Sequence, residues 1–245
     1  MMRGSIKEEY YLDRKLFIYL PPSYGKSEKK FPVLYSHDGK DVERIVEKLI
    51  LFLEEGFEKG TLQECIWVSI YPTQNRRHHE YTPWPAPALD PRFEDFEGLG
   101  NDYIRFVTED LKTYIDQHYT TLKEAEHTWM MGYSLGGLIS IYSAYLTPKF
   151  GKIACICGSF WYQDAVQWIK EHEMLNPEVK LFVYYGKTEG QGKKTIQQYA
   201  VQCAESVVDV LRQQHPNQLE AMWDEGGHHQ YVESRYQNAI KWLLQ

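Results

Sequence analysis

The sequence predicts an α/β protein with a mostly parallel central sheet and helices on both faces. Strand-like and helix-like patterns alternate along almost all of the 245 residues, which is typical of such sheets. A serine between glycines stands between a strand pattern and a helix pattern, within Gly132–Gly137. No linker, repeat or low-complexity segment interrupts the chain, so we expect residues 1–245 to form a single domain.

The first half of the chain contains strands that are short apolar runs next to turn-forming residues: Lys15–Leu20, Phe31–Tyr35 and Cys65–Tyr71. Apolar residues at helical spacing predict helices from about Val42 to Glu58 and from about Asp102 to Tyr119. Between these two helices, residues 72–100 show no convincing periodicity and are rich in proline and charge. A segment of this length without structure is usually functional in a compact domain.

The second half of the chain continues the alternation. The predicted strands are Thr128–Met131, Ile153–Cys157, Lys180–Tyr185 and Leu219–Trp223. The predicted helices cover about Leu138–Tyr145, Ala165–Glu173, Thr195–Gln214 and Tyr231–Leu244. Each strand is therefore followed by a helix, as parallel strands require.

Composition and charge exclude several classes of partner. The net charge of −7 argues against nucleic acid or an anionic membrane. No apolar run approaches the length of a membrane span, and the first ten residues are polar, unlike a signal peptide. The four cysteines lie in apolar patterns rather than in a disulfide framework, so we expect reduced thiols and a cytoplasmic location. Composition does not indicate an oligomeric state.

The segment Gly132-Tyr133-Ser134-Leu135-Gly136 matches the G-x-S-x-G nucleophile elbow of the α/β-hydrolase fold. In this elbow a sharp turn from strand to helix lifts a serine hydroxyl clear of the sheet. A side chain at Gly132 or Gly136 would push the strand and the helix apart. Ser134 is therefore the predicted nucleophile.

A serine hydroxyl needs a base, and in this fold the base is a histidine that follows the last strand. His228 and His229 directly follow Gly226-Gly227, after the strand pattern at 219–223. The two glycines allow a sharp exit from the strand, which favours His228 as the base.

The acid that orients the histidine should lie between the serine and the histidine in the chain, after the strand at 180–185. Glu189 occupies this place and is the predicted acid. Asp164, after the preceding strand, and Asp224, just before the histidines, are the alternatives.

Attack by a serine on a carbonyl group also requires backbone donors for the negative oxygen of the tetrahedral intermediate. The N–H of Leu135, directly after the nucleophile, is one candidate. The other is the N–H of Lys40, because Gly39 permits a close approach of the backbone in the loop after the strand at 31–35.

The loop from Asn75 to Trp84 is a candidate wall of the substrate pocket. Arg77 would meet an anionic or catechol-like group there, and Trp84 and Trp161 would supply flat surfaces. The alternative is that Arg77 pairs with Glu80 or with a helix C-terminus and only holds the loop. The adjacent histidines His78 and His79 lack the further ligands of a metal site nearby in the sequence. We therefore expect no metal and no cofactor.

Several further motifs lie along the chain: Ile18-Tyr19-Leu20-Pro21-Pro22-Ser23-Tyr24, Phe31-Pro32-Val33-Leu34-Tyr35, Asp38-Gly39, Glu80-Tyr81-Thr82-Pro83, Gly158-Ser159-Phe160-Trp161-Tyr162 and Gly226-Gly227-His228. Together with the elbow, these motifs resemble the esterase D-like putative esterases of the α/β-hydrolase fold. That group includes enterobactin-type siderophore esterases and S-formylglutathione hydrolases. The resemblance implies the same nucleophile, base, acid and oxyanion donors. His37 and His229 depart from the family pattern, which commonly has an aliphatic residue and a polar Asn or Asp at these places.

We therefore expect a serine carboxylic-ester hydrolase that works through an acyl-enzyme on a small-molecule ester. Siderophore-type esters and small acyl esters are the expected substrates. An acyltransferase or a thioesterase with the same triad is the first alternative. A catalytically silent binding protein is the second, and loss of a triad residue would mark it.

Overall fold

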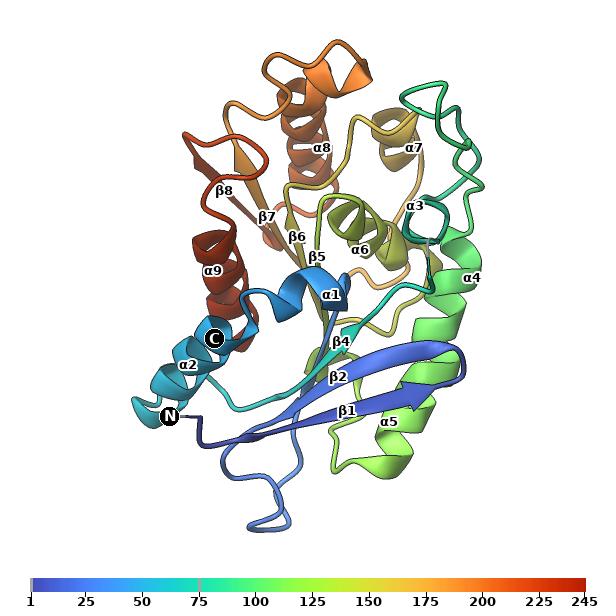
Figure 1. Cartoon of the computed structure of the whole chain (residues 1–245). Helices are drawn as coiled ribbons and strands as arrows, with labels where there is room; N and C mark the ends of the chain where they lie inside the picture. The colour runs from blue at the N-terminus through green and yellow to red at the C-terminus, as the bar shows by residue number, and fades with distance from the viewer. Residues whose placement is uncertain (1, 75) are drawn as a thin grey trace.

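The computed structural model describes residues 2–74 and 76–245, so Asn75 at the start of the predicted pocket loop lies outside the described residues. One eight-stranded sheet runs through the molecule in the order β1-β2-β4-β3-β5-β6-β7-β8 (Figure 1). The strands are β1 Ser5–Tyr11, β2 Arg14–Leu20, β3 Val33–Ser36, β4 Ile66–Ile70, β5 Thr128–Tyr133, β6 Lys152–Ile156, β7 Lys180–Gly186 and β8 Leu219–Asp224. β2 runs antiparallel to β1 and β4, whereas the strands from β4 to β8 in this order are parallel. The predicted α/β fold with a mostly parallel sheet is confirmed.

Helices cover both faces of the sheet, as Figure 1 shows. One face is packed against α1 Gly39–Glu43, α2 Val46–Glu58 and α9 Val232–Leu244. The other is packed against α4 Gly100–Arg105, a π-helical turn Phe106–Leu111, α5 Lys112–His118, α6 Leu135–Leu146, α7 Ala165–Glu171 and α8 Ala200–Gln214. The remaining elements are the short helix α3 Arg77–Glu80 and two 3-10 turns, Ala125–His127 and Ile196–Tyr199. Burial of apolar side chains on both faces of the sheet explains why most strands are continuous apolar runs.

The first strand, β1, was not predicted. It pairs with β2 through a tight hairpin, from Ser5 opposite Leu20 to Tyr11 opposite Arg14. Its residues are partly or fully exposed, since it lies at the edge of the sheet. Backbone pairing with β2 therefore holds this strand, and its sequence lacks the apolar pattern that identifies a buried strand.

Two predicted helices are interrupted in the structure. The helix expected at 42–58 is divided into α1 and α2, with a break at Arg44 and Ile45. The helix expected at 102–119 runs on through the π-helical turn between α4 and α5. Hydrophobic periodicity does not distinguish these variants, because the apolar face stays almost continuous through them.

The parallel strands end at one edge of the sheet, so the loops that follow them meet there. The short loop after β3 leads into α1, which carries Lys40, and the turn after β5 carries Ser134. The loops after β7 and β8 carry Glu189 and His228. Within the described residues, no helix is both long and apolar enough to cross a membrane.

Candidate active site

Ser134 lies in a strained turn between β5 and α6, with φ 62° and ψ −121°. Backbone hydrogen bonds on both sides stabilise this conformation. The N–H of Ser134 donates to the carbonyl of Ile156 at 2.9 Å, and the N–H of Ser159 donates to the carbonyl of Ser134 at 3.0 Å. A Cβ atom at Gly132 would lie 2.3 Å from the carbonyl oxygen of Gly136. The glycines are therefore required by the close approach of strand and helix, as the elbow motif predicts.

The structure brings Ser134, His228 and Glu189 together. The Nε2 atom of His228 lies 3.1 Å from the Oγ atom of Ser134, and its Nδ1 atom lies 2.7 Å from Oε2 of Glu189. The Glu189 side chain is 2% exposed and that of His228 is 28% exposed. A base in contact with the serine, and a buried carboxylate in contact with the base, is the arrangement that nucleophilic catalysis by serine needs.

The two alternative acids lie elsewhere. Asp224 accepts two hydrogen bonds from Arg235, both at 2.7 Å, and another from the N–H of Gly226. Asp164 is the residue before α7, and its carboxylate lies 3.4 Å from the side-chain amide of Gln163. Among the described residues, Glu189 alone places a carboxylate within 4.0 Å of His228.

The two predicted oxyanion donors lie in the first turns of two helices. Leu135 begins α6 and Lys40 is the second residue of α1. The backbone N–H groups of both make no hydrogen bond to other described residues, as is usual in the first turn of a helix. The side chain of Lys40 is exposed. These N–H groups are therefore available to an anionic oxygen.

The loop between β3 and α1, which precedes Lys40, is held against the elbow through Asp38. The Asp38 backbone has φ 58°, and its N–H donates to the hydroxyl of Tyr81 at 3.2 Å. Its carboxylate accepts from Nε and Nη2 of Arg77 at 2.5 and 2.7 Å. A Cβ atom at Gly136 would lie 3.2 Å from Oδ2 of Asp38, which shows how closely the loop and the elbow approach.

Arg77 both lines the cavity at Ser134 and forms this ion pair. Burial acts to lower the pKa of Arg77, but the charge and hydrogen bonds of Asp38 raise it above its ordinary value. The pairing with Glu80 considered from the sequence is wrong, because Glu80 binds Arg14 at 2.8 and 2.9 Å. Arg77 therefore connects the cavity wall to the loop that precedes the predicted oxyanion donor.

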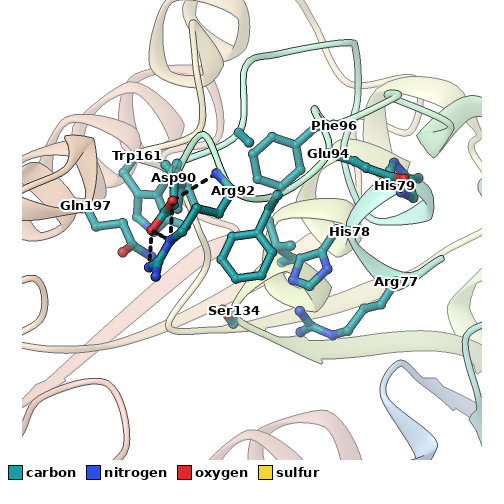
Figure 2. Close-up of a pocket in the computed structure, with 14 residues that line it drawn as sticks. Arg77, His78, His79, Asp90, Arg92, Glu94, Phe96, Ser134, Trp161 and Gln197 are labelled. Carbon is teal, nitrogen blue, oxygen red and sulfur yellow. Dashed lines mark hydrogen bonds and ion pairs between the residues drawn. The ribbon is translucent and has the colours of Figure 1, made fainter. Parts of the chain in front are cut away.

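A cavity of about 550 Å³ opens at Ser134. Figure 2 shows Ser134 at its base, with Arg77 and His78 on one side and Trp161 on the other. Its further lining residues are His79, Ala88, Leu89, Asp90, Arg92, Phe93, Glu94, Phe96, Leu135 and Gln197. The predicted loop at 72–100 thus supplies most of the wall.

Trp84 does not line this cavity, unlike the other residues predicted to contact substrate. Its indole N–H donates to the carbonyl of Gln163 at 3.0 Å. Its rings pack against Tyr142, Tyr162 and Trp168, with centroids 5.6 to 6.1 Å away. Trp84 therefore packs the loop onto α6 and α7 and lies outside the lining of this cavity.

Ser159 was not singled out as a site residue. Its Oγ atom lies 3.3 Å from Oγ of Ser134, and the residue is fully buried. The Gly158-Ser159 motif after β6 was the only signal for it in the sequence.

His37 fills the space behind the elbow. It is fully buried, its Nδ1 atom lies 2.7 Å from the hydroxyl of Tyr103, and its Nε2 atom has no partner among the described residues. A Cβ atom at Gly132 would lie 2.7 Å from the imidazole ring. Burial, together with the charge of Arg77, lowers the pKa of His37 to about 3. The imidazole is therefore neutral at neutral pH.

This neutral histidine makes the free energy of unfolding depend on pH. The unfolded chain binds a proton at His37 below its ordinary pKa of 6.5, whereas the folded chain does so only near pH 3. Stability from this group is therefore present above pH 6.5 and is lost as the pH falls toward 3. We expect a loss of about 2 kcal/mol between pH 7 and pH 5.

Urea unfolding of the wild type and of His37→Gln at pH 7 and pH 5 measures this effect. Glutamine can retain a hydrogen bond to Tyr103 but does not titrate. Between pH 7 and pH 5, His37→Gln should therefore lose about 2 kcal/mol less stability than the wild type. An equal loss in both proteins would contradict the neutral buried imidazole.

Within residues 2–74 and 76–245, one group of side chains has metal-ligand character. The ligand atoms of Cys157, Glu189 and His228 lie within 4.8 Å of one another. However, Nη1 of Arg235 lies 2.8 Å from the sulfur of Cys157, and burial raises the pKa of this thiol well above its ordinary value. A guanidinium at this distance and a neutral thiol are both unfavourable to a cation.

Comparison with known proteins identifies a family for the chain. A family model described as "Putative esterase" matches residues 9–242. The uncharacterized protein YbbA of Bacillus subtilis (strain 168) is 34% identical over 247 residues, which cover 99% of this chain and 97% of YbbA.

Two solved structures show the same fold. An IroE-like serine hydrolase from Shewanella oneidensis has a TM-score of 0.78 at 20% identity, covering 98% of this chain and 80% of its own. The enterobactin esterase FES from Shigella flexneri has a TM-score of 0.77 at 16% identity, covering 98% of this chain and 59% of its own. At these identities the two structures are evidence for the fold alone.

Proposed function

The chain belongs to the putative esterase family, and from this premise we propose that it is a serine carboxylic-ester hydrolase working through an acyl-enzyme. Ser134 is the nucleophile, His228 the general base and Glu189 the acid that orients the base. The observation that carries the proposal is the continuous contact from Ser134 to His228 at 3.1 Å and from His228 to Glu189 at 2.7 Å.

In the first half of the reaction, the Oγ atom of Ser134 attacks the ester carbonyl while His228 takes its proton. The carbonyl oxygen becomes negative and accepts hydrogen bonds from the N–H groups of Leu135 and Lys40. His228 then gives the proton to the departing alcohol, which leaves the acyl group on Ser134. In the second half, His228 takes a proton from a water molecule, which attacks the acyl-enzyme and releases the carboxylic acid.

The cavity supports an ester with a flat, aromatic acyl group. Phe93, Phe96 and Trp161 offer ring surfaces, and Arg77, ion-paired with Asp38, lines the cavity together with Ser134. The volume of about 550 Å³ is in the range of small-molecule sites. The FES structure was determined with enterobactin and with 2,3-di-hydroxy-N-benzoyl-serine. Siderophore-type esters are therefore our first substrate class, and small acyl esters are the second.

Acyl transfer and thioester hydrolysis are alternatives on the same residues, since they differ in the acceptor or the leaving group rather than in the triad. The silent binding protein is disfavoured, because His228 contacts both the serine hydroxyl and the carboxylate of Glu189. We place the enzyme in the cytoplasm, and its four unpaired cysteines support a reducing compartment.

A fluorophosphonate probe tests the proposal, since it reacts covalently with an activated serine. We expect stoichiometric labelling, mapped by peptide mass spectrometry to Ser134. Absence of labelling would instead support the silent binding protein. A panel of p-nitrophenyl esters, aryl thioesters and catecholate siderophore lactones, with and without an added alcohol acceptor, then separates the substrate classes and acyl transfer.

A further inference from the structure

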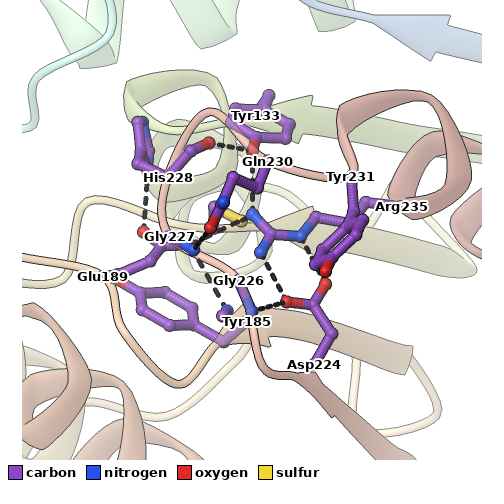
Figure 3. A network of polar contacts seen from close by, with 12 residues as sticks. Tyr133, Tyr185, Glu189, Asp224, Gly226, Gly227, His228, Gln230, Tyr231 and Arg235 are labelled. Carbon is purple, nitrogen blue, oxygen red and sulfur yellow. Dashed lines mark hydrogen bonds and ion pairs between the residues drawn. The ribbon is translucent and has the colours of Figure 1, made fainter.

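A fully buried arginine from α9 reaches the rear of the proposed triad (Figure 3). Arg235 donates through Nε and Nη2 to the carboxylate of Asp224, both at 2.7 Å. Its Nη1 atom lies 3.0 Å from the hydroxyl of Tyr133 and 3.4 Å from Oε1 of Glu189. Nη1 also lies 2.8 Å from the sulfur of Cys157, so the guanidinium has partners from four separate segments of the chain.

Three of these partners, Glu189, Tyr133 and Asp224, belong to the proposed triad or adjoin one of its members. Glu189 contacts His228 through Oε2, while its Oε1 faces Arg235. Tyr133 directly precedes Ser134, and its hydroxyl donates to the carbonyl oxygen of His228. Asp224 ends β8 and accepts the N–H of Gly226, which shapes the turn before His228. The Arg235 side chain thus contacts each of the segments that carry the nucleophile, the acid and the base.

The charged groups around Arg235 largely offset one another. The guanidinium offsets one of the two carboxylates, Asp224 and Glu189, so the group carries one net negative charge when His228 is neutral. It becomes neutral when His228 takes the proton of Ser134. Without Arg235, two carboxylates would lie uncompensated at a buried site, which is strongly unfavourable.

Among the described residues, the titratable groups that face this set include Tyr133, Tyr184 and Cys157 around Arg235, Tyr185 beside Glu189, and His229 beside His228. Burial raises the pKa of Tyr133, Tyr184 and Cys157, so these groups stay neutral at neutral pH. Burial, with the charge of His228, lowers the pKa of His229. The balance of charge behind His228 is therefore set by Arg235, Asp224 and Glu189.

Building on the proposed triad, we infer that Arg235 is a positioning residue for ester hydrolysis. It holds the Glu189 carboxylate and the loop of His228 in place, and it touches no reacting atom. This role requires the forked geometry of a guanidinium, because Asp224, Tyr133 and Glu189 are bound in different directions at once.

The test compares Arg235→Met, Arg235→Lys and the double variant Asp224→Asn/Arg235→Met with the wild type. We expect kcat for a p-nitrophenyl ester to fall about 10- to 100-fold in Arg235→Met, with KM within about twofold. The acid limb of kcat/KM should move to higher pH, because loss of a positive charge favours the imidazolium of His228. Arg235→Lys keeps the charge, so its limb should stay near the wild type while kcat remains reduced.

The double variant separates positioning from charge balance and from folding. It removes one positive and one negative charge, so we expect a wild-type acid limb and a cooperative thermal transition, but still a reduced kcat. Arg14→Met breaks another buried arginine–carboxylate pair, Arg14–Glu80, and controls for loss of stability alone. It should not move the acid limb.

A wild-type kcat in the double variant would overturn the proposal, since Arg235 would then only neutralise Asp224. An unshifted limb with unchanged kcat in Arg235→Met would also overturn it. The rate of fluorophosphonate labelling keeps the two proposals apart. If the wild type and Arg235→Met are labelled at equal rates, only the positioning role of Arg235 is refuted. If the wild type is not labelled, the proposed esterase activity is refuted.

Discussion

Replacing Ser134 with alanine is expected to lower kcat/KM for a p-nitrophenyl ester by about 10⁴- to 10⁶-fold. Alanine has no Oγ atom to attack the carbonyl, and the contact with His228 at 3.1 Å is lost with it. The fold should survive, because backbone hydrogen bonds to Ile156 and from Ser159 and Leu138 hold the turn. Steady-state kinetics together with a thermal melt measure both expectations.

Ser143→Ala is the matched control for this variant. Ser143 lies on the same helix, α6, and its hydroxyl donates to the carbonyl of Ser140 at 2.6 Å, away from the cavity. We expect near wild-type turnover in the control. Retention of turnover in Ser134→Ala would refute the proposed nucleophile, provided that the activity copurifies with the protein.

Replacing Glu189 with glutamine is expected to lower kcat by about 10³- to 10⁴-fold. Arg235 donates toward Oε1, so the glutamine oxygen should face Arg235 and its NH₂ group should face Nδ1 of His228. This orientation favours the tautomer with the proton on Nε2, which cannot accept the proton of Ser134. Loss of the carboxylate charge also destabilises the imidazolium that forms during the reaction.

Asp164→Asn is the control for the choice of acid. Asp164 has φ 61°, a conformation that asparagine tolerates, and its carboxylate does not contact His228. We expect its kcat to stay within about twofold of the wild type, since the substitution removes only a surface charge. A large loss of kcat in Asp164→Asn, with full activity in Glu189→Gln, would identify Asp164 and not Glu189 as the triad acid.

Sequence patterns anticipated much of the fold, and the reason lies in their local nature. Buried strands such as β5 and β7 are continuous apolar runs, and the turn at Ser134 needs glycines within two residues on either side. β1 escaped prediction because its edge position leaves its residues exposed and its stability rests on backbone pairing.

The pocket was harder to anticipate than the elbow. Arg77 and Trp161 do line the cavity, but Trp84 packs against α6 and α7 instead. A tryptophan in a proline-rich loop has no local pattern that indicates which way its ring faces. That direction depends on where the loop meets its neighbours.

The sequence by itself determined the fold class, the elbow at Ser134 and the chain order in which Glu189 and His228 follow it. These depend on hydrophobic period, glycine and the order of strands, all of which act locally or in chain order. Only the tertiary structure decided that Glu189, rather than Asp164 or Asp224, contacts His228, and that Asp224 binds Arg235. Such contacts join residues far apart in the chain. They arise because the carboxyl ends of parallel strands converge and because buried charges must find a partner there.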